Sequence, residues 1–402
     1  MMRPRPDNFK TTANPPSVSA PLWLLALITL SGTLAMHIFV PALPHTAHDL
    51  GASAGAAQWT LSAYILGLAL GQLTYGPISD HFGRRPVLAA GLVVYALASV
   101  AAMLAPNIES LIALRFVQAL GGCSGLVLGR AIVRDTVSGD DAARKLSLMN
   151  LMVYMGPGLS PLIGSLLAET TGWRSIFVVL SLLGFFNLAL MWRLLPETSG
   201  GAGHDVGTVL RSYRHLAASR RFIGYTIGGG CATTSLYGFI GAAPFIFTDQ
   251  LHRPTHEIGF YLFLTIVGVW FGSLTASRLI GGLSTRRLMV MGNMLTCVAA
   301  IVFLLFVLSG SLTVLSTIIP IVVLCFGAGI ASPTALAEAM SINPAIAGSA
   351  SGLYGFAQMA IGALCTALGG FGGNHALAAA LVLAGAGLIA QVAFWWADRE
   401  RA

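Results

Sequence analysis

Residues 76–88 read Gly-Pro-Ile-Ser-Asp-His-Phe-Gly-Arg-Arg-Pro-Val-Leu and lie between two long apolar runs. Gly and Pro interrupt regular structure, and Asp80, Arg84 and Arg85 place charges where an apolar run ends. Only helices or closed barrels can cross a membrane, and their charged ends lie in water. The stretch therefore predicts a tight loop between two membrane-spanning helices.

The composition agrees with this interpretation. Of the 402 residues, 55% are hydrophobic and only 9% are charged, and the mean hydropathy is +0.78. A soluble domain carries about 25% charged residues, so the chain is predicted to be a multi-pass membrane protein. The net charge of +7 is therefore not interpreted as a sign of nucleic-acid binding. The five cysteines lie in apolar runs without CxxC spacing, which favours a packing role over disulfides or metal ligands.

A membrane-spanning helix needs about 20 apolar residues. The hydropathy pattern predicts twelve spans, near residues 22–42, 57–78, 86–105, 109–132, 145–168, 173–195, 222–248, 257–280, 287–308, 313–335, 343–369 and 375–396. The first span has no small-residue cleavage site after it and is expected to be retained. The predicted fold is thus an all-α membrane protein, with one bundle in residues 1–195, a linker at 196–221 and a second bundle in residues 222–402.

The basic residues predict the orientation. Apart from Arg115, which falls inside a span, they lie near the N-terminus, in the even-to-odd loops or at the C-terminus, and only Arg174 and Arg253 lie on the other side. Because Lys and Arg collect in cytoplasmic loops, both termini are predicted to be cytoplasmic. The basic run at 211–221 is interpreted as part of this solvated charge and not as a nucleic-acid site.

Several motifs together resemble the major facilitator superfamily. The pattern G-x-x-x-D-x-x-G-R-R at 76–85 resembles its loop signature between the second and third helices, and Leu-Arg-Phe-Val-Gln-Ala-Leu-Gly at 114–121 resembles its fourth-helix signature. Residues 156–164 resemble the Gly/Pro motif of drug:proton antiporters. Gly-Trp-Arg at 172–174 and Leu-Pro-Glu-Thr at 195–198 belong to the same pattern. Residues 39–44 and 129–135 resemble the bicyclomycin/chloramphenicol-resistance (Bcr/CflA) branch.

This resemblance implies two six-helix bundles built from inverted repeats, which move alternately to open a central pathway. It implies export of drug-like small molecules from the cytoplasm of a bacterium, across its inner membrane and in exchange for protons. A degenerate copy of the loop motif between the eighth and ninth spans fits the repeat. It comprises Gly272 to Arg278, followed by Arg286 and Arg287, and has Ala276 in place of the aspartate.

The loop motif is predicted to act as a gate. A carboxylate can accept hydrogen bonds from the exposed N–H groups of a helix start and can pair with a guanidinium. The resemblance implies that Asp80 binds the N-terminal end of the eleventh span and Arg130 or Arg134 when the protein faces outward. A solvated positive-inside loop is the alternative. The predicted gating residues are Asp80, Gly76, Gly83, Arg84, Arg85, Arg130 and Arg134.

Arg115 and His37 are the main candidates inside the membrane. A charged residue in a span is costly unless it is paired or faces water, so Arg115 is predicted to bind substrate, with structural pairing to carbonyl groups as the alternative. The family usually has an acid in the first span, where this chain has His37. Histidine titrates near neutral pH. His37 is therefore the candidate for proton coupling and substrate contact, with a packing role as the alternative, and a group at a span end such as Asp249 or Glu257 is the alternative proton carrier.

Helical spacing adds further candidates in the spans that are expected to line the pathway. The predicted substrate-binding residues are Arg115, His37, Gln118, Thr33, Tyr64, Asn150, Tyr154, Thr234 and Tyr237. Each of the Thr and Tyr residues could instead form hydrogen bonds between helices.

Other functions are less well supported by the sequence. No P-loop, HExxH or GxSxG motif is present, so neither an enzyme nor a cofactor is expected, and the pairs His45/His48 and His252/His256 are not expected to bind metal. Because no carboxylate is predicted opposite Arg115, a transporter of an anionic or zwitterionic metabolite, such as an amino-acid derivative, remains an alternative. A polytopic membrane enzyme is the alternative from another class. The expected partners are a small-molecule substrate, protons and the lipid bilayer, and the chain is expected to be a monomer.

Overall fold

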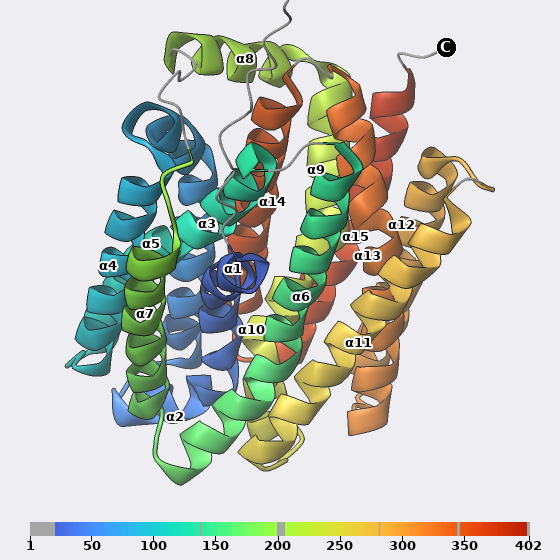
Figure 1. Ribbon diagram of the computed structural model, residues 1–402. Coiled ribbons are helices and arrows are strands. Elements are labelled where there is room, and N and C mark those ends of the chain that lie inside the picture. Colours follow the sequence, from blue (N-terminus) through green and yellow to red (C-terminus); the bar gives the residue numbers. More distant parts are fainter. Residues whose placement is uncertain (1–20, 137–138, 199–205, 281, 344–345, 400–402) are drawn as a thin grey trace, which may run out of the picture.

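The computed structural model describes residues 21–136, 139–198, 206–280, 282–343 and 346–399. Within these ranges every regular element is helical (Figure 1). The predicted basic N-terminus, with Arg3, Arg5 and Lys10, lies outside the described residues, as do residues 199–205 of the predicted linker.

The helices follow the predicted spans. In chain order they are α1 (Leu22–Ile38), η1 (Val40–Ala42), α2 (Leu43–Asp49), α3 (Ala54–Phe82), α4 (Arg84–Met103), α5 (Ile108–Thr136), α6 (Gly139–Thr170), α7 (Arg174–Leu194), α8 (Val206–Ala218), α9 (Arg220–Thr234), α10 (Leu236–Phe245), η2 (Ile246–Gln250), α11 (Thr255–Leu279), α12 (Thr285–Leu308), α13 (Val314–Ser341), α14 (Ala347–Gly369) and α15 (His375–Asp398). In the described part of the chain, ten segments are long and apolar enough to cross a membrane. With α3 and α6, of 29 and 32 residues, they make up the twelve predicted spans.

The first and seventh spans differ in detail from the prediction. The first continues through η1 and α2 to Asp49. The seventh, predicted as one run, is interrupted at Ser235 between α9 and α10. Just before the break, the Thr233 and Thr234 hydroxyls donate to the carbonyls four residues earlier, at 2.6 and 2.8 Å. Such bonds compete with the helical ladder and bend helices, which accounts for the interruption.

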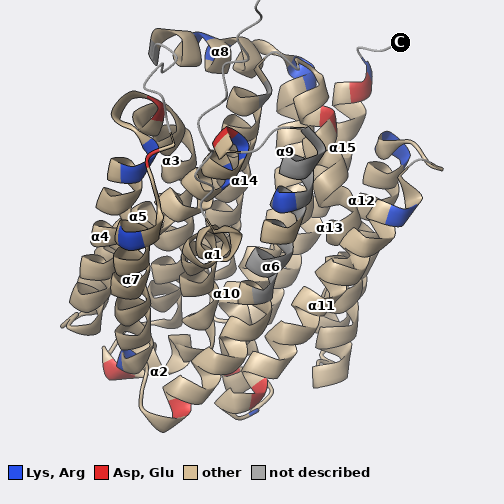
Figure 2. Cartoon of the chain, in the orientation of Figure 1, with Lys and Arg blue, Asp and Glu red and all other residues tan. Residues whose placement is uncertain are grey.

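The two ends of the molecule differ in charge. We call the end that carries α8 the α8 face and the end that carries α2 the opposite face (Figure 1). Lys and Arg gather at the α8 face (Figure 2). Among the described residues, Arg174 and Arg253 are the only basic residues at the opposite face. The end of α15 lies at the α8 face (Figure 1), and the start of α1 packs in a cluster with Leu88 and Ile132. Large apolar side chains point outward between the faces, as a lipid environment requires, including Leu97, Phe186, Val298 and Leu388, each more than half exposed.

The two bundles, α1 to α7 and α9 to α15, repeat the same close helix crossings. A Cβ on Gly121 of α5 would lie 2.7 Å from the carbonyl oxygen of Gly91, and one on Gly327 of α13 would lie 2.6 Å from that of Gly292. Gly91 and Gly292 differ by 201 in residue number, as do Gly71 and Gly272, whereas Gly121 and Gly327 differ by 206. Small residues let membrane helices approach in this way, so these crossings are evidence for the internal repeat.

The crossings correct the alignment of the degenerate loop motif. Sequence comparison pairs Gly272 with Gly76, but a Cβ on Gly76 would meet nothing within 4 Å. Gly71 and Gly272 are the equivalent positions, because both press closely on the neighbouring helix, α5 and α13 respectively. The sequence comparison of the two loop motifs was therefore wrong by five residues. It matched Gly272 to Gly76 by the neighbouring residues in the sequence, whereas the packing of the helices matches it to Gly71. The position equivalent to Asp80 is then 281, which lies outside the described residues.

The hydrophobic core shows how the bundles meet. One cluster joins both bundles toward the opposite face, with Phe39 and Phe177 of the first and Phe239 and Ile258 of the second. At the α8 face the cores are separate. One is built around Leu25, Leu88 and Ile132 in the first bundle, and the other around Phe222, Met289 and Phe394 in the second. The bundles therefore share one apolar cluster toward the opposite face and have separate clusters at the α8 face, where α3 and α14 still touch at Gln72 and Gly355.

Candidate functional site

Arg115 lies inside the first bundle, with a side chain that is 0% exposed. Its guanidinium donates hydrogen bonds to Gln118 Oε1 at 2.6 Å and to the Ala35 carbonyl at 3.1 Å. It also lies over the rings of Tyr64 and Phe39, 4.1 and 5.1 Å from their centres, in cation–π geometry. In this conformation the side chain is enclosed, so substrate could reach it only after the bundle rearranges.

The predicted residues around Arg115 form one network. Gln118 donates to the Ser99 hydroxyl at 2.8 Å, and the Tyr64 hydroxyl donates to the Gly32 carbonyl at 2.7 Å. Together these bonds tie α1, α3, α4 and α5 to one another. Within the described part of the chain, no carboxylate forms an ion pair with Arg115. The structure thus brings three of the predicted substrate-binding residues, Arg115, Gln118 and Tyr64, into contact with one another, and their role in binding substrate stays a prediction.

His37 lies where the two bundles meet, and its side chain is buried. Its Nδ1 is 2.9 Å from the Thr33 carbonyl, an acceptor, so the neutral ring carries its hydrogen on Nδ1 and leaves Nε2 able to take a proton. The ring of Tyr237, from α10 in the second bundle, lies edge-on at 6.3 Å. His37, Thr33 and Tyr237 are thus brought together across the bundle interface.

The surroundings of His37 are mostly apolar. The ring lines a cavity of about 10 Å³ together with residues of η1, α6, α10 and α11, namely Val40, Pro157, Pro161, Ile240, Leu262, Thr265 and Ile266. Apart from His37, none of the residues that line this cavity has an ionisable side chain. A charged group in such a site is unfavourable unless it is paired, so the site suits the neutral imidazole.

The remaining predicted pathway residues are only partly placed. Thr234 donates to the Gln358 carbonyl of α14 at 2.8 Å, and the Gln358 amide donates to Thr233 at 2.7 Å. Thr234 therefore joins two helices of the second bundle. Asn150 and Tyr154 fall on α6, in a stretch whose side chains lie outside the described residues.

The loop motif forms a network of charges at the α8 face. Gly83, at φ +93°, separates α3 from α4 in a conformation that side chains rarely adopt. Arg84 then forms ion pairs with Asp80, one turn earlier, and with Asp135 Oδ2 at 2.9 Å. In this conformation Asp80 is thus paired with Arg84 and not in the predicted contact with α14. Asp135 ends the sequence motif at residues 129–135, but the sequence analysis predicted no role for its carboxylate.

Glu197 is a further member of this network that the sequence reasoning left without a role. Its carboxylate accepts hydrogen bonds from the backbone amides of Arg84 at 3.0 Å and Arg85 at 3.1 Å. It therefore caps the N-terminus of α4, where the helix dipole favours a negative charge. Arg85 in turn donates to the Trp192 carbonyl at 2.7 Å. The signal was present, because an acid follows the sixth span directly and the third begins with an uncapped Gly-Arg-Arg.

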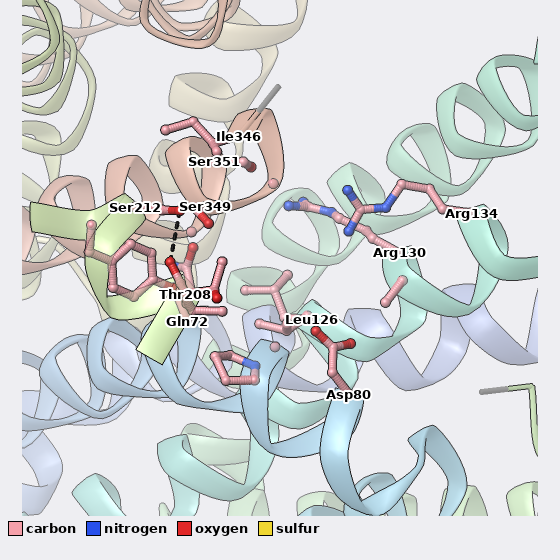
Figure 3. Close-up of a pocket in the computed structure, with 18 of the residues that line it drawn as sticks. Gln72, Asp80, Leu126, Arg130, Arg134, Thr208, Ser212, Ile346, Ser349 and Ser351 are labelled. Atoms are coloured by element: carbon pink, nitrogen blue, oxygen red, sulfur yellow. Dashed lines mark hydrogen bonds between the residues drawn. The ribbon is translucent and has the colours of Figure 1, made fainter. Parts of the chain in front are cut away.

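A cavity of about 390 Å³ lies beside this network, at the α8 face between the bundles. Asp80, Arg130 and Arg134 line it from the first bundle, and Ser349 and Ser351 of α14 line it from the second (Figure 3). Helix α8 covers it, and the Tyr213 hydroxyl of α8 reaches the Leu73 carbonyl of α3 at 3.5 Å. The structure thus brings the predicted gating residues Gly76, Asp80, Arg84, Arg130 and Arg134 to one cavity.

Comparison with known proteins identifies the family. The protein-family model described as Major Facilitator Superfamily matches residues 25–366 of this chain. The chain belongs to the major facilitator superfamily. This family and fold are those of membrane transporters rather than of enzymes.

Relatives in the superfamily agree with the predicted branch. The chain is 31% identical over 341 residues to multidrug resistance protein D of Escherichia coli, covering 84% of this chain and 85% of that protein. It is 27% identical over 356 residues to a bicyclomycin resistance protein homolog of Haemophilus influenzae, covering 86% and 87%. The predicted kinship with the Bcr/CflA branch is thereby confirmed. A D-xylose–proton symporter structure has the same fold, with a TM-score of 0.76 at 14% identity, covering 93% of this chain and 96% of that one.

Proposed function

We propose that this protein exports small drug-like molecules from the cytoplasm, across the bacterial inner membrane and in exchange for protons. The substrate class is supported by the relatives, which are named for multidrug and bicyclomycin resistance. The orientation is supported by the Lys and Arg residues gathered at the α8 face, which would be cytoplasmic, together with both termini (Figure 2).

The division of the core is the observation that carries the transport mechanism. Toward the opposite face one hydrophobic cluster joins both bundles, whereas at the α8 face each bundle has its own cluster and a cavity of about 390 Å³ lies between them. This arrangement supports a conformation that is open to the cytoplasm. Rocking of the bundles would reverse it, with Asp80 moving from Arg84 toward the start of α14.

His37 is the proposed proton carrier. It lies within the packed interface that must separate when the opposite face opens, and its apolar surroundings suit the neutral ring. Protonation at Nε2 would therefore favour separation of Tyr237 and the α11 residues from the ring. A proton taken up from outside would favour the outward-open state, and its release inside would follow closure, as antiport requires.

The buried charge of Arg115 favours the second candidate substrate, an anionic or zwitterionic metabolite. No described carboxylate pairs with Arg115, so a bundle that opened around it would offer an unneutralised guanidinium to a ligand. A carboxylate is the group that a guanidinium binds best, through two parallel hydrogen bonds.

Everted membrane vesicles test the coupling. A panel of lipophilic cations and small anions is added to acidified vesicles that contain wild type, His37→Gln or the control His81→Gln, which changes an exposed histidine in the last turn of α3. We expect substrate-dependent proton release with wild type and the control. We expect His37→Gln to retain substrate exchange but to release no protons. Full proton release by His37→Gln would exclude His37 as the carrier, and a response to anions alone would favour the second substrate class.

A further inference from the structure

The residues that line the cavity at the α8 face could bind a ligand as well as act as a gate. It lies between the bundles beneath α8, and its volume of about 390 Å³ exceeds what a few water molecules need. Its walls come from α3, α5, α8 and α14, so any molecule bound there would contact both bundles and the helix that links them.

The charges that line the cavity favour an anion. Arg84 is engaged by Asp80 and Asp135 in two ion pairs. Arg130 and Arg134 add two further positive charges from α5, one turn apart along the same side of the helix (Figure 3). Asp80 is the only carboxylate among the residues that line the cavity in the described part of the chain. The lining therefore carries a net positive charge.

The facing wall supplies hydrogen-bond donors. Ser349 and Ser351 of α14 line the cavity, and Thr208 of α8 adds another hydroxyl group, whereas the Ser212 hydroxyl donates to the Thr208 carbonyl at 3.0 Å (Figure 3). The cavity also meets the start of α14, a helix of 23 residues whose N-terminus has no side-chain cap. The first amides of such a helix have no partner within it and favour negative charge. A Cβ on Gly348, in this first turn, would meet nothing within 4 Å, so the approach to these amides is open.

We propose that this cavity binds a small anion of phosphate or carboxylate chemistry, as a free ion or as the headgroup of an anionic lipid. Arg130 and Arg134 bind it from one side, and the hydroxyls and first amides of α14 bind it from the other. The proposal does not depend on the identity of the transported substrate. It assigns the cavity a ligand of its own.

The bound anion would compete with Asp80. This step rests on the proposed transport mechanism, in which closure of the α8 face moves the Asp80 carboxylate toward the start of α14, the same site that the anion occupies. Because both are negative, they cannot share it without repulsion. The anion therefore holds the α8 face open, and its release permits closure.

Thermal unfolding of the purified full chain tests the proposal, with inorganic phosphate titrated at constant pH and ionic strength against chloride. We expect a saturable rise in Tm for wild type, because a ligand that binds the folded state stabilises it. Arg134→Ala should weaken the apparent affinity roughly tenfold, the effect of about 1.4 kcal/mol. Asp80→Asn should strengthen it, since it removes the competing charge. Arg287→Ala is the control, because Arg287 lies at the same face but does not line the cavity.

Opposite shifts in Arg134→Ala and Asp80→Asn are the required signature, since general destabilisation would not give them. No saturable rise in wild type, or equal affinity in Arg134→Ala and Arg287→Ala, would overturn the proposal. Nanodiscs separate the two sources of the anion. If phosphatidylglycerol competes with phosphate and phosphatidylcholine does not, the headgroup is the occupant, and if neither competes, the occupant is a free ion.

Discussion

The two halves of this protein share a scaffold but not an interior. Gly91 and Gly121 bring α4 and α5 into backbone contact, and Gly292 and Gly327 do the same for α12 and α13. Among the residues that the structure describes, the network around Arg115 is present in the first bundle and not in the second. With the offset of Gly91 and Gly292, Tyr64 corresponds to Thr265 and Ser99 to Ala300. With the offset of Gly121 and Gly327, Arg115 corresponds to Ile321 and Gln118 to Leu324. All four positions in the second bundle are buried. The same crossings therefore enclose a charged network in one bundle and an almost wholly apolar core in the other.

This difference shows that the fold does not require the buried charge. The second bundle packs with Ile321 and Leu324 where the first has Arg115 and Gln118. Replacing a buried polar network by apolar residues of similar size is often neutral for stability or even favourable. A network that the scaffold can do without in one half is expected to be kept in the other half for function.

Transplanting the second interior into the first gives the largest expected effect. Arg115→Ile leaves the Gln118 side chain and the Ala35 carbonyl without their donor, which costs about 1–3 kcal/mol. Adding Gln118→Leu copies the pair Ile321–Leu324 and should restore most of that stability. We expect transport in vesicles to be essentially abolished in both variants, while Tm in detergent recovers only in the double variant. Wild-type transport by the double variant would mean that the two interiors are interchangeable and that Arg115 is structural.

The sequence could predict the scaffold better than this interior. Apolar runs located the long helices, ten of which are long and apolar enough to cross a membrane in the described part of the chain, because hydropathy reports which segments can lie in lipid. The distribution of basic residues separated the two faces. Neither signal reports which side chains meet inside a bundle. The enclosure of Arg115 by Tyr64 and Phe39, the interruption at Ser235 and the pairing of Gly272 with Gly71 depend on the rotation and depth of each helix, and apolar runs leave these open.

The site was predictable in part for the same reason. The charges of the loop motif were identified because charge is rare near a membrane span, and the structure brings Asp80, Arg130 and Arg134 to one cavity. Glu197 was given no role, because its partners are backbone amides more than a hundred residues away. Every residue except proline carries a backbone amide, so the sequence shows the acid after the sixth span but does not show which amides it caps.

The shared scaffold can be tested at the two equivalent crossings. A Cβ on Gly121 would lie 2.4 Å from the Tyr95 amide nitrogen, and one on Gly327 would lie 2.9 Å from that of Thr296. Since backbone must shift in both cases, Gly121→Ala and Gly327→Ala should each lower stability by about 1–3 kcal/mol. Gly385→Ala is the control, because its Cβ would meet nothing within 4 Å. A loss of Tm in only one of the two equivalent variants would show that the halves do not share the same packing.

The smallest expected effect concerns the acids at the ends of the two bundles. Glu197 and Asp398 are related by the same offset as Gly91 and Gly292, and each meets the start of the third helix of its half. Glu197 is exposed and caps backbone amides, whereas the Asp398 side chain is 6% exposed and pairs with Arg286 at 2.6 Å and with the Tyr225 hydroxyl at 2.9 Å.

Their burial predicts different responses to salt. Glu197→Gln should cost about 0.5–1 kcal/mol, because the amide oxygen still accepts one hydrogen bond but the favourable charge at the helix start is lost. Asp398→Asn should cost about 1–3 kcal/mol, because it leaves a partly buried guanidinium without its partner. Tm measured at low and high salt separates the two variants. The penalty of Glu197→Gln should shrink as ions screen the exposed charge, while that of Asp398→Asn should persist. Equal screening of both would mean that the buried pair in the second half contributes no more than a surface contact.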